Sequence, residues 1–425
     1  KVSPRLTDPA PADMPRAAGK SIAPYLEGMV RDYYEESGWD RKTGKPLRST
    51  LKRLGLEEFI DDVGGQRDLA HKVIRMLTPR AFVNDPVRLL RAFRLAAGLE
   101  FSIEPATLAA IAQHAGLIRK SAGERIKEEL FKMLQSDNSH PYFLQMADSG
   151  LFLQLFSEFT ADDKDPASPV RKPPAPDDTF CADAQLDAYG QLEDLLKDPA
   201  RQLAPILGAH DQEFSGTAKA LLKFSILWHN IGGPASQSCA AAGPRVKGQN
   251  ADQCKDADAN RSAAIAQRLC RRYRFANRHT EYIHFIIKNQ TRPFALFSAD
   301  QSNTLIRDDT IRFFMTSRAR TPGLMLHALA EMYAQQGKNS ARGRAFSDFV
   351  MRLLQNEYPA FESEAALPPL ITGRDLINEF KLAPSPLFRE ILYAIEEARL
   401  CGKAKTRSEA LQMVKEIMAG QAPAQ

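Results

Sequence analysis

Residues 84–99 read NDPVRLLRAFRLAAGL, and the rest of the chain is organised around this stretch. Pro86 is tolerated at the start of a helix, and an Asp or Asn before it can cap the free backbone amides there. Apolar residues then recur at three- and four-residue spacing, which predicts a helix with one buried stripe. The stripe consists of Leu89, Ala92, Phe93, Ala96 and Leu99.

Three arginines lie outside that stripe. Arg88, Arg91 and Arg94 follow Asp85 at one-turn spacing, so they form a polar ridge along the predicted helix. Their guanidinium groups are planar sets of donors that can pair with a base edge or with a phosphate. The alternative is a capped helix whose charged face only contacts water. The residues alone leave both interpretations open.

The run from Asn84 to Ala97 resembles the neck of the bacterial-type tRNA nucleotidyltransferase and poly(A) polymerase family. Two flanking runs agree with this resemblance. Ile60-Asp61 with GGQRDL at 64–69 resembles the end of the family's catalytic head, and SAGERI at 121–126 with EEL at 128–130 resembles its next neck motif. Asn84 stands where the family usually has an acidic residue.

The resemblance implies roles for individual residues of these runs. Asp85 and Arg88 would read the base edge of an incoming nucleotide, with Arg91 beside them, and these three form the predicted nucleotide site. We assign Arg94 and Arg125, from the same runs, to RNA binding.

The composition sets limits on the class of protein. A chain of 425 residues is long for one core and predicts two to four modules. The net charge of +5 is small, so charge alone argues weakly for a polyanionic partner. The five cysteines form no CxxC pair, which argues against a zinc ribbon or iron–sulfur site and predicts a reducing compartment. No apolar run approaches about eighteen residues, and no signal-peptide pattern is present, so we expect a cytoplasmic protein without a membrane partner.

The first sixty residues differ in character from the remainder of the chain. Residues 1–20 are rich in Pro and Ala, which predicts an extended or disordered segment. Residues 21–59 predict a helical hairpin with a turn at 38–46. Its apolar positions are Leu26, Met29, Val30 and Tyr33 on one helix and Leu51, Leu54 and Leu56 on the other.

This hairpin resembles the C-terminal tail of the aldehyde ferredoxin oxidoreductase family. The shared features are a Tyr-Tyr helix at 33–34, a Gly-Trp-Asp turn at 38–40 and a Leu-Gly-Leu ending at 54–56. So short a piece cannot hold the tungstopterin or iron–sulfur ligands of that family, and we interpret it as a packing element. An accessory segment of an oxidoreductase is the alternative.

The catalytic carboxylates expected of the first family are missing. That family transfers nucleotides with metal-bound carboxylates in a β-sheet head, because in-line displacement needs metals at the attacking and leaving oxygens. No Asp-x-Asp pair precedes Ile60. We therefore expect no catalytic residue and no cofactor in this chain, with Mg²⁺ and a nucleoside triphosphate required only where a head is present. The alternative is a full nucleotidyltransferase whose head lies outside this chain.

A second module begins after a Pro- and Asp-rich stretch. Residues 220–234, ALLKFSILWHNIGGP, resemble the His-Asp (HD) helix of the metal-dependent phosphohydrolase domain that some family members carry. An amide is a poor substitute for a carboxylate ligand, so we expect a degenerate domain without metal and a buried, hydrogen-bonded His229. The substituted ligand positions are Asn230, Asp258, Gln290 and Glu331.

The most basic part of the chain is residues 261–292, with seven arginines and one lysine against Glu281. Arginine forks can bind phosphates, and aromatic faces can stack on unpaired bases. This segment therefore predicts RNA contact, and the alternative is a helix whose arginines are only solvated. The predicted RNA-binding residues here are Arg271, Arg272, Tyr273, Arg274, Arg278 and Arg292.

The last segment, which begins LPPLITGRDLINEF at Leu367, resembles the tail of the same family, which holds tRNA there. We therefore predict an all-α chain that lacks the β-sheet head and binds RNA, with tRNA the expected partner, in tRNA 3′-end processing. A nucleotide is a possible further ligand. The predicted domains are an extension at 1–59, a neck at 60–157, a linker at 158–184, a degenerate phosphohydrolase-like body at 185–362 and a tail at 363–425.

Overall fold

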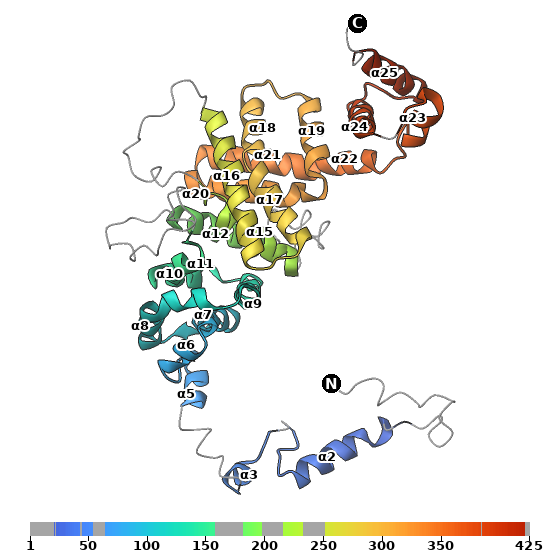
Figure 1. Ribbon diagram of the computed structural model, residues 1–425. Coiled ribbons are helices and arrows are strands. Elements are labelled where there is room, and N and C mark those ends of the chain that lie inside the picture. Colours follow the sequence, from blue (N-terminus) through green and yellow to red (C-terminus); the bar gives the residue numbers. More distant parts are fainter. Residues whose placement is uncertain are drawn as a thin grey trace. The chain divides into compact units, whose positions relative to one another are not determined.

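The computed structural model describes residues 21, 23–42, 45–53, 64–157, 182–197, 216–232, 251–383 and 385–420. The chain divides into two compact units, residues 1–77 and 78–425. The described part is almost entirely helical (Figure 1), and its two strands, β1 (Val73–Ile74) and β2 (Ser102–Ile103), have two residues each. The predicted all-α fold is confirmed. Within the described ranges, no helix has both the length and the apolar character needed to cross a bilayer.

The first unit contains the predicted hairpin. An antiparallel bridge between Trp39 and Pro46 closes the turn, and the Thr50 hydroxyl donates to the Gly38 carbonyl. The first α-helix of the hairpin, residues 26–36, has no buried residue, although the sequence predicted an apolar face that includes Tyr33. Leu54, Leu56 and residues 1–20 lie outside the described residues. The elements of this unit are η1 (Ala23–Tyr25), α2 (Leu26–Glu36), α3 (Arg48–Arg53), α5 (Gly65–Ala70) and β1.

The second unit starts with the helices of the predicted neck. On α7 the predicted stripe is buried except for Leu99, which is 49% exposed because Glu100 adopts a left-handed conformation and ends the helix there. Val87 and Leu90 are also fully buried, so α7 is covered on more than one side. The neck helices are α6 (Arg80–Asn84), α7 (Val87–Leu99), α8 (Pro105–His114), η2 (Ala115–Lys120), α9 (Gly123–Leu134), α10 (His140–Asp148) and α11 (Leu151–Leu155).

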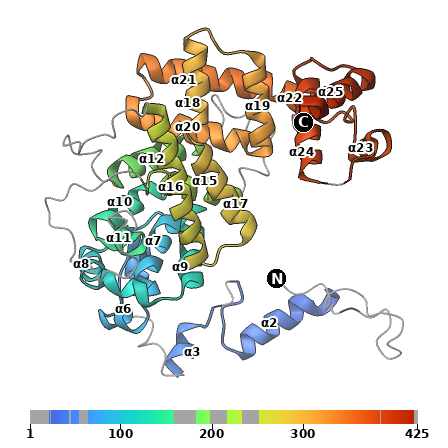
Figure 2. The same ribbon diagram turned by 45° about the horizontal axis from the view of Figure 1, so that its top comes forward.

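The body continues the same unit, and Figure 2 shows α15, α16 and α17 beside one another, with α12 and α20 next to them. Its core is aromatic, with Phe224, Trp228 and Phe275 in mutual ring contact. Most of the predicted linker, up to residue 181, lies outside the described residues. The body consists of α12 (Ala182–Lys197), α15 (Gly216–Trp228), α16 (Ala251–Arg272), α17 (Asn277–Asn289), α18 (Arg292–Gln301), α19 (Arg307–Ser317), η5 (Arg318–Arg320), α20 (Thr321–Gln336), α21 (Ala341–Arg352), η6 (Leu353–Glu357) and α22 (Tyr358–Ala365).

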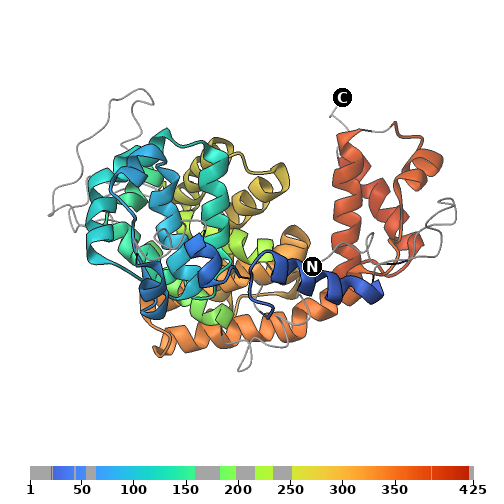
Figure 3. The ribbon, with the colours of Figure 1, turned by 90° about the horizontal axis from the view of Figure 1, so that it is seen from below.

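The tail forms a small hydrophobic core of its own, and Figure 3 shows its helices from below. It comprises α23 (Gly373–Phe380), α24 (Pro386–Leu400) and α25 (Arg407–Gly420). Thr372 and Asp375 cap α23 reciprocally. Thr406 and Glu409 form a capping box before α25, because each side chain accepts from the other's backbone amide.

A buried ion pair connects the neck to the body. Lys223 on α15 donates to the Glu193 carboxylate on α12 over 2.6 Å and to the Ser136 carbonyl, at the end of α9, over 2.7 Å. The same carboxylate accepts from the backbone amides of Ser139 (3.0 Å) and His140 (2.9 Å), where α10 begins. Two body helices therefore hold the turn between α9 and α10.

Both members of this pair are fully or almost fully buried. Burial alone would raise the pKa of Glu193, but the charge and hydrogen bonds of Lys223 outweigh it, so the pKa lies below its ordinary value. Burial lowers the pKa of Lys223 to about 8, so both groups are charged at neutral pH. Since unfolded Glu193 binds its proton at a higher pH than folded Glu193, its contribution is present above the ordinary pKa and is lost as the pH falls through the folded value.

We predict that Lys223→Met lowers the free energy of unfolding by about 3 to 5 kcal/mol, because it leaves a buried carboxylate without its partner. The control is Lys219→Met, one turn earlier on α15, whose partner Asp137 is 71% exposed. That change should cost about 1 kcal/mol or less. Urea denaturation of both variants measures the difference, and equal losses would contradict the role given to the buried pair.

Candidate nucleotide and RNA interface

Asp85 lies at a break between two helices. α6 ends at Asn84, Asp85 is extended (φ −145°, ψ 91°), and Pro86 leads into α7. Arg125 from α9 donates to the Asp85 carboxylate over 2.9 Å, and the Arg88 guanidinium lies 3.7 Å from the same oxygen. The Arg125 hydrogen bond is the largest cause that holds the pKa of Asp85 below its ordinary value. Asp85 is therefore an ionised acceptor beside two arginines.

A second carboxylate holds the other end of the ridge. Arg91 donates from Nε and Nη2 to Oε1 of Glu129 over 3.2 and 3.1 Å, and Arg94 Nε lies 2.6 Å from Oε2. Glu129 is only 5% exposed, whereas the side chains of Arg88 and Arg91 are 49% and 42% exposed. The structure thus brings all five residues predicted from the two neck runs onto one surface of α7 and α9.

Sequence reasoning assigned no role to Glu129, although a signal was present. Ile126, Leu130 and Met133 form the buried stripe of α9, and Glu129 falls on the same stripe. A charged residue within an apolar stripe requires a buried partner. The spacing could not show that the partners are arginines of a different helix.

The basic segment turns a corner between α16 and α17. Arg271, Arg274 and Arg278 are exposed there, and Arg274 has a left-handed backbone (φ 56°) that makes the corner. Lys127 on α9 donates to the Arg274 carbonyl over 3.0 Å. These three arginines, which we call the basic corner, therefore lie next to the neck helix that carries Arg125.

Three of the predicted RNA-binding residues are not part of the basic corner. Arg272 donates to the Leu155 carbonyl, and its guanidinium packs on the Tyr273 ring at 4.8 Å. Tyr273 is 2% exposed and its hydroxyl also donates to Leu155, so in this conformation the ring has no face open to a base. Arg292 begins α18, at the other end of α17, a 13-residue helix about 20 Å long.

The positions that resemble an HD centre lie close together in the body. His229 is buried, its Nδ1 lies 2.6 Å from the Ile226 carbonyl oxygen, and its Nε2 lies 2.9 Å from the Asn230 side-chain amide nitrogen. Gln290 donates to the His229 carbonyl (2.9 Å), and Glu331 lies 3.9 Å from Nε2.

Burial raises the pKa of Glu331 and also that of Asp258, whose carboxylate lies 3.6 Å from Arg261. Among the described residues, no group of three or more His, Cys, Asp and Glu side chains is arranged to hold a metal. The interpretation of this region as a degenerate HD domain stays a prediction.

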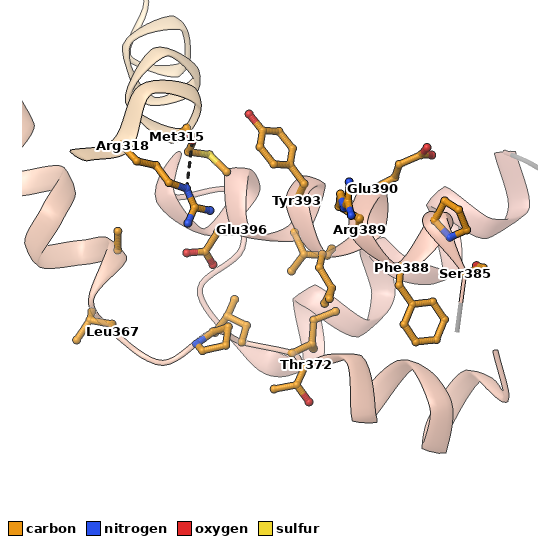
Figure 4. Close-up of a pocket in the computed structure, with 17 residues that line it drawn as sticks. Met315, Arg318, Leu367, Thr372, Ser385, Phe388, Arg389, Glu390, Tyr393 and Glu396 are labelled. Carbon is orange, nitrogen blue, oxygen red and sulfur yellow. Dashed lines mark hydrogen bonds between the residues drawn. The ribbon is translucent and has the colours of Figure 1, made fainter. Parts of the chain in front are cut away.

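A pocket of about 1130 Å³ lies between the end of α19 and the tail (Figure 4). Its lining is mostly apolar, with Arg318, Arg389 and Glu396 among its polar members. Arg318 has φ 43° and ψ −133°, a conformation that residues other than Gly rarely adopt. Hydroxyl groups of Thr321 and Tyr358 donate to its carbonyl and hold it there.

Two protein families match parts of the chain. Residues 100–163 match the family described as "Probable RNA and SrmB- binding site of polymerase A". Residues 1–56 match the family described as "Aldehyde ferredoxin oxidoreductase, domains 2 & 3". Both matches agree with the resemblances found in the sequence.

Several relatives match over longer stretches. A CC-adding tRNA nucleotidyltransferase of Geobacter sulfurreducens is 36% identical over 186 residues, which is 43% of this chain and 39% of that protein. An A-adding tRNA nucleotidyltransferase of Deinococcus radiodurans is 24% identical over 425 residues, covering 93% of this chain and 88% of that protein. A CC-adding enzyme of Synechocystis is 24% identical over 85% of this chain and 70% of its own length.

Solved structures are also similar. A CCA-adding enzyme with ATP is 17% identical, with a TM-score of 0.49, over 86% of this chain and 67% of that one. The Thermotoga maritima CCA-adding enzyme complexed with tRNA is 17% identical, with a TM-score of 0.46, over 84% of this chain and 67% of that one.

We predict that Gly123→Ala destabilises the protein by about 1 to 3 kcal/mol, because a Cβ there would lie 2.1 Å from the Arg272 carbonyl oxygen and would push α9 away from the basic corner. Gly98→Ala, within α7, is the matched control, since its Cβ would meet its nearest atom at 3.9 Å. That control should be stabilising by about 0.5 to 1 kcal/mol. Thermal denaturation compares them, and the same sign for both would contradict close packing at Gly123.

Proposed function

We propose that this chain is the RNA-binding portion of a member of the tRNA nucleotidyltransferase and poly(A) polymerase family, and that it acts on tRNA. Its relatives add C or A residues to tRNA according to their names, which supports a place in tRNA 3′-end processing. The single observation that carries the RNA-binding role is the exposed basic corner beside α9. The match to the aldehyde ferredoxin oxidoreductase family lies outside this proposal.

The neck would read a nucleotide base. Asp85 is an acceptor and Arg88 a donor, side by side at the start of α7. Within the described part of the chain, the Arg88 guanidinium meets Asp85 at 3.7 Å, beyond hydrogen-bonding distance, so its donors are open to a ligand. Cytosine and adenine present an amino donor beside a ring-nitrogen acceptor, which matches this pair, whereas uracil and guanine present the reverse order.

The basic corner would bind the RNA backbone. Arg271 and Arg278 are exposed, and the Arg274 guanidinium lies 3.6 Å from the Glu124 carboxylate, which is itself exposed. Exposed ion pairs of this kind contribute little, so a phosphate can replace the carboxylate at small cost. Each phosphate that an arginine neutralises releases condensed counterions, and binding therefore becomes dependent on salt.

We predict that replacing Arg271, Arg274 and Arg278 together by Ala reduces the log–log salt slope of tRNA binding by about 2 to 3, if each arginine contacts one phosphate. Arg272 is left out of this variant because it donates to Leu155. Filter binding over a salt series measures the slope.

The matched control replaces Lys338, Arg342 and Arg344, three exposed cations near the α20–α21 turn, and removes the same charge. It should leave the slope nearly unchanged, as should Arg88→Ala, which acts on the base. An unaltered slope in the variant of the basic corner would mean that these arginines are only solvated.

A second candidate function is full nucleotidyl transfer, favoured by the match to 88% of the Deinococcus A-adding enzyme. We predict no incorporation of labelled CMP or AMP into tRNA by this chain at stoichiometric concentration, because no Asp-x-Asp carboxylate pair precedes Ile60. A reaction without protein is the control. Incorporation above it would support the second candidate and reject the RNA-binding role as the whole function.

A further inference from the structure

Glu129 is a buried carboxylate on α9, a helix whose other acids, Glu124 and Glu128, are exposed. Its two carboxylate oxygens contact different arginines of α7: Arg91 donates to Oε1, and Arg94 lies beside Oε2. Burying an ionised carboxylate is costly unless it is paired and hydrogen-bonded. Helix packing alone does not require a charge at this position, and both oxygens of the carboxylate contact arginines of α7.

The ridge is divided between two acids. At one end, the Asp85 carboxylate forms ion pairs with Arg88 and Arg125. At the other end, the Glu129 carboxylate forms ion pairs with Arg91 and Arg94. Arg88 and Arg91 are one helical turn apart and carry like charges, which repel each other. With Glu129 neutralised, Asp85 would be the one of these two acids that still carries a charge, and the freed arginines would compete for it.

We propose that Glu129 is a positioning residue for nucleotide selection. It holds Arg91 and Arg94 away from Asp85, and so leaves Asp85 and Arg88 as an undisturbed acceptor–donor pair for a base edge. The proposal rests on the proposed nucleotide-reading role of the neck. Glu129 itself does not touch the nucleotide, and its effect passes through the two arginines.

The first test does not depend on nucleotide binding. The full chain is labelled with phenylglyoxal, which modifies accessible guanidinium groups, and the labelling of each arginine is measured by peptide mass spectrometry. In Glu129→Gln, labelling of Arg91 and Arg94 should rise several-fold. Glu128→Gln, the same change at the exposed neighbouring position, should leave labelling unchanged, and Glu129→Asp should keep most of the protection.

The second test measures selectivity by calorimetric titration of the full chain with CTP and with UTP. The unchanged chain should bind CTP more tightly, and in Glu129→Gln the ratio of the two affinities should fall by about tenfold, the effect of losing one good contact. Glu128→Gln should keep the ratio, and Glu129→Asp should restore most of it. A variant that only loosened the fold would weaken CTP and UTP binding alike.

The outcomes separate the proposals. Unchanged labelling in a folded Glu129→Gln would overturn the positioning role. Increased labelling with an unchanged CTP to UTP ratio would overturn its connection to selectivity. An unchanged chain that binds CTP and UTP equally would reject the nucleotide-reading role of the neck, and the proposal for Glu129 with it.

Discussion

The ion pair between Glu193 and Lys223 is the constraint on which the second unit depends. It joins α12 and α15 of the body to the turn between α9 and α10 of the neck, where Lys223 also binds the Ser136 carbonyl. Because both charges are buried, separating them would leave each charge unpaired in a low-dielectric interior, which is costly. The orientation of α9 relative to the body is therefore fixed from one end of that helix.

That orientation explains why two charged surfaces lie side by side. On one side α9 supplies Arg125 and Glu129 to the arginine ridge of α7, and on the other it supplies Lys127 to the basic corner. In the ridge, Glu129 holds Arg91 and Arg94, and Arg88 lies beside Asp85 with open donors, which suits selection of a base. Arginines of the corner are exposed and weakly paired, which suits contact with a phosphate backbone whose sequence is not read.

The sequence predicted the helices well, but it did not predict the partners of the buried charged residues. The spacing of the apolar residues predicted α7, because a helix repeats every 3.6 residues. The prediction that Leu99 lies in the core was wrong, because α7 ends at that residue and leaves its side chain exposed. Glu129 falls on an apolar helical stripe and Lys223 interrupts an apolar run, but their partners are 38 and 30 residues away, a separation that no local pattern encodes. Tyr273 was expected to face RNA, whereas α16 ends so that its ring packs on Phe156.

The most direct test of the account is photocrosslinking of the chain to tRNA that carries 4-thiouridine, with identification of the crosslinked peptides. Residues 123–127 and 271–278 should both be crosslinked, because contacts of Glu124 and Lys127 with Arg274 place the two segments side by side. Excess unlabelled tRNA should compete. Competable crosslinks confined to the first unit, residues 1–77, or to α20 and α21 would contradict the assignment of RNA binding to this surface.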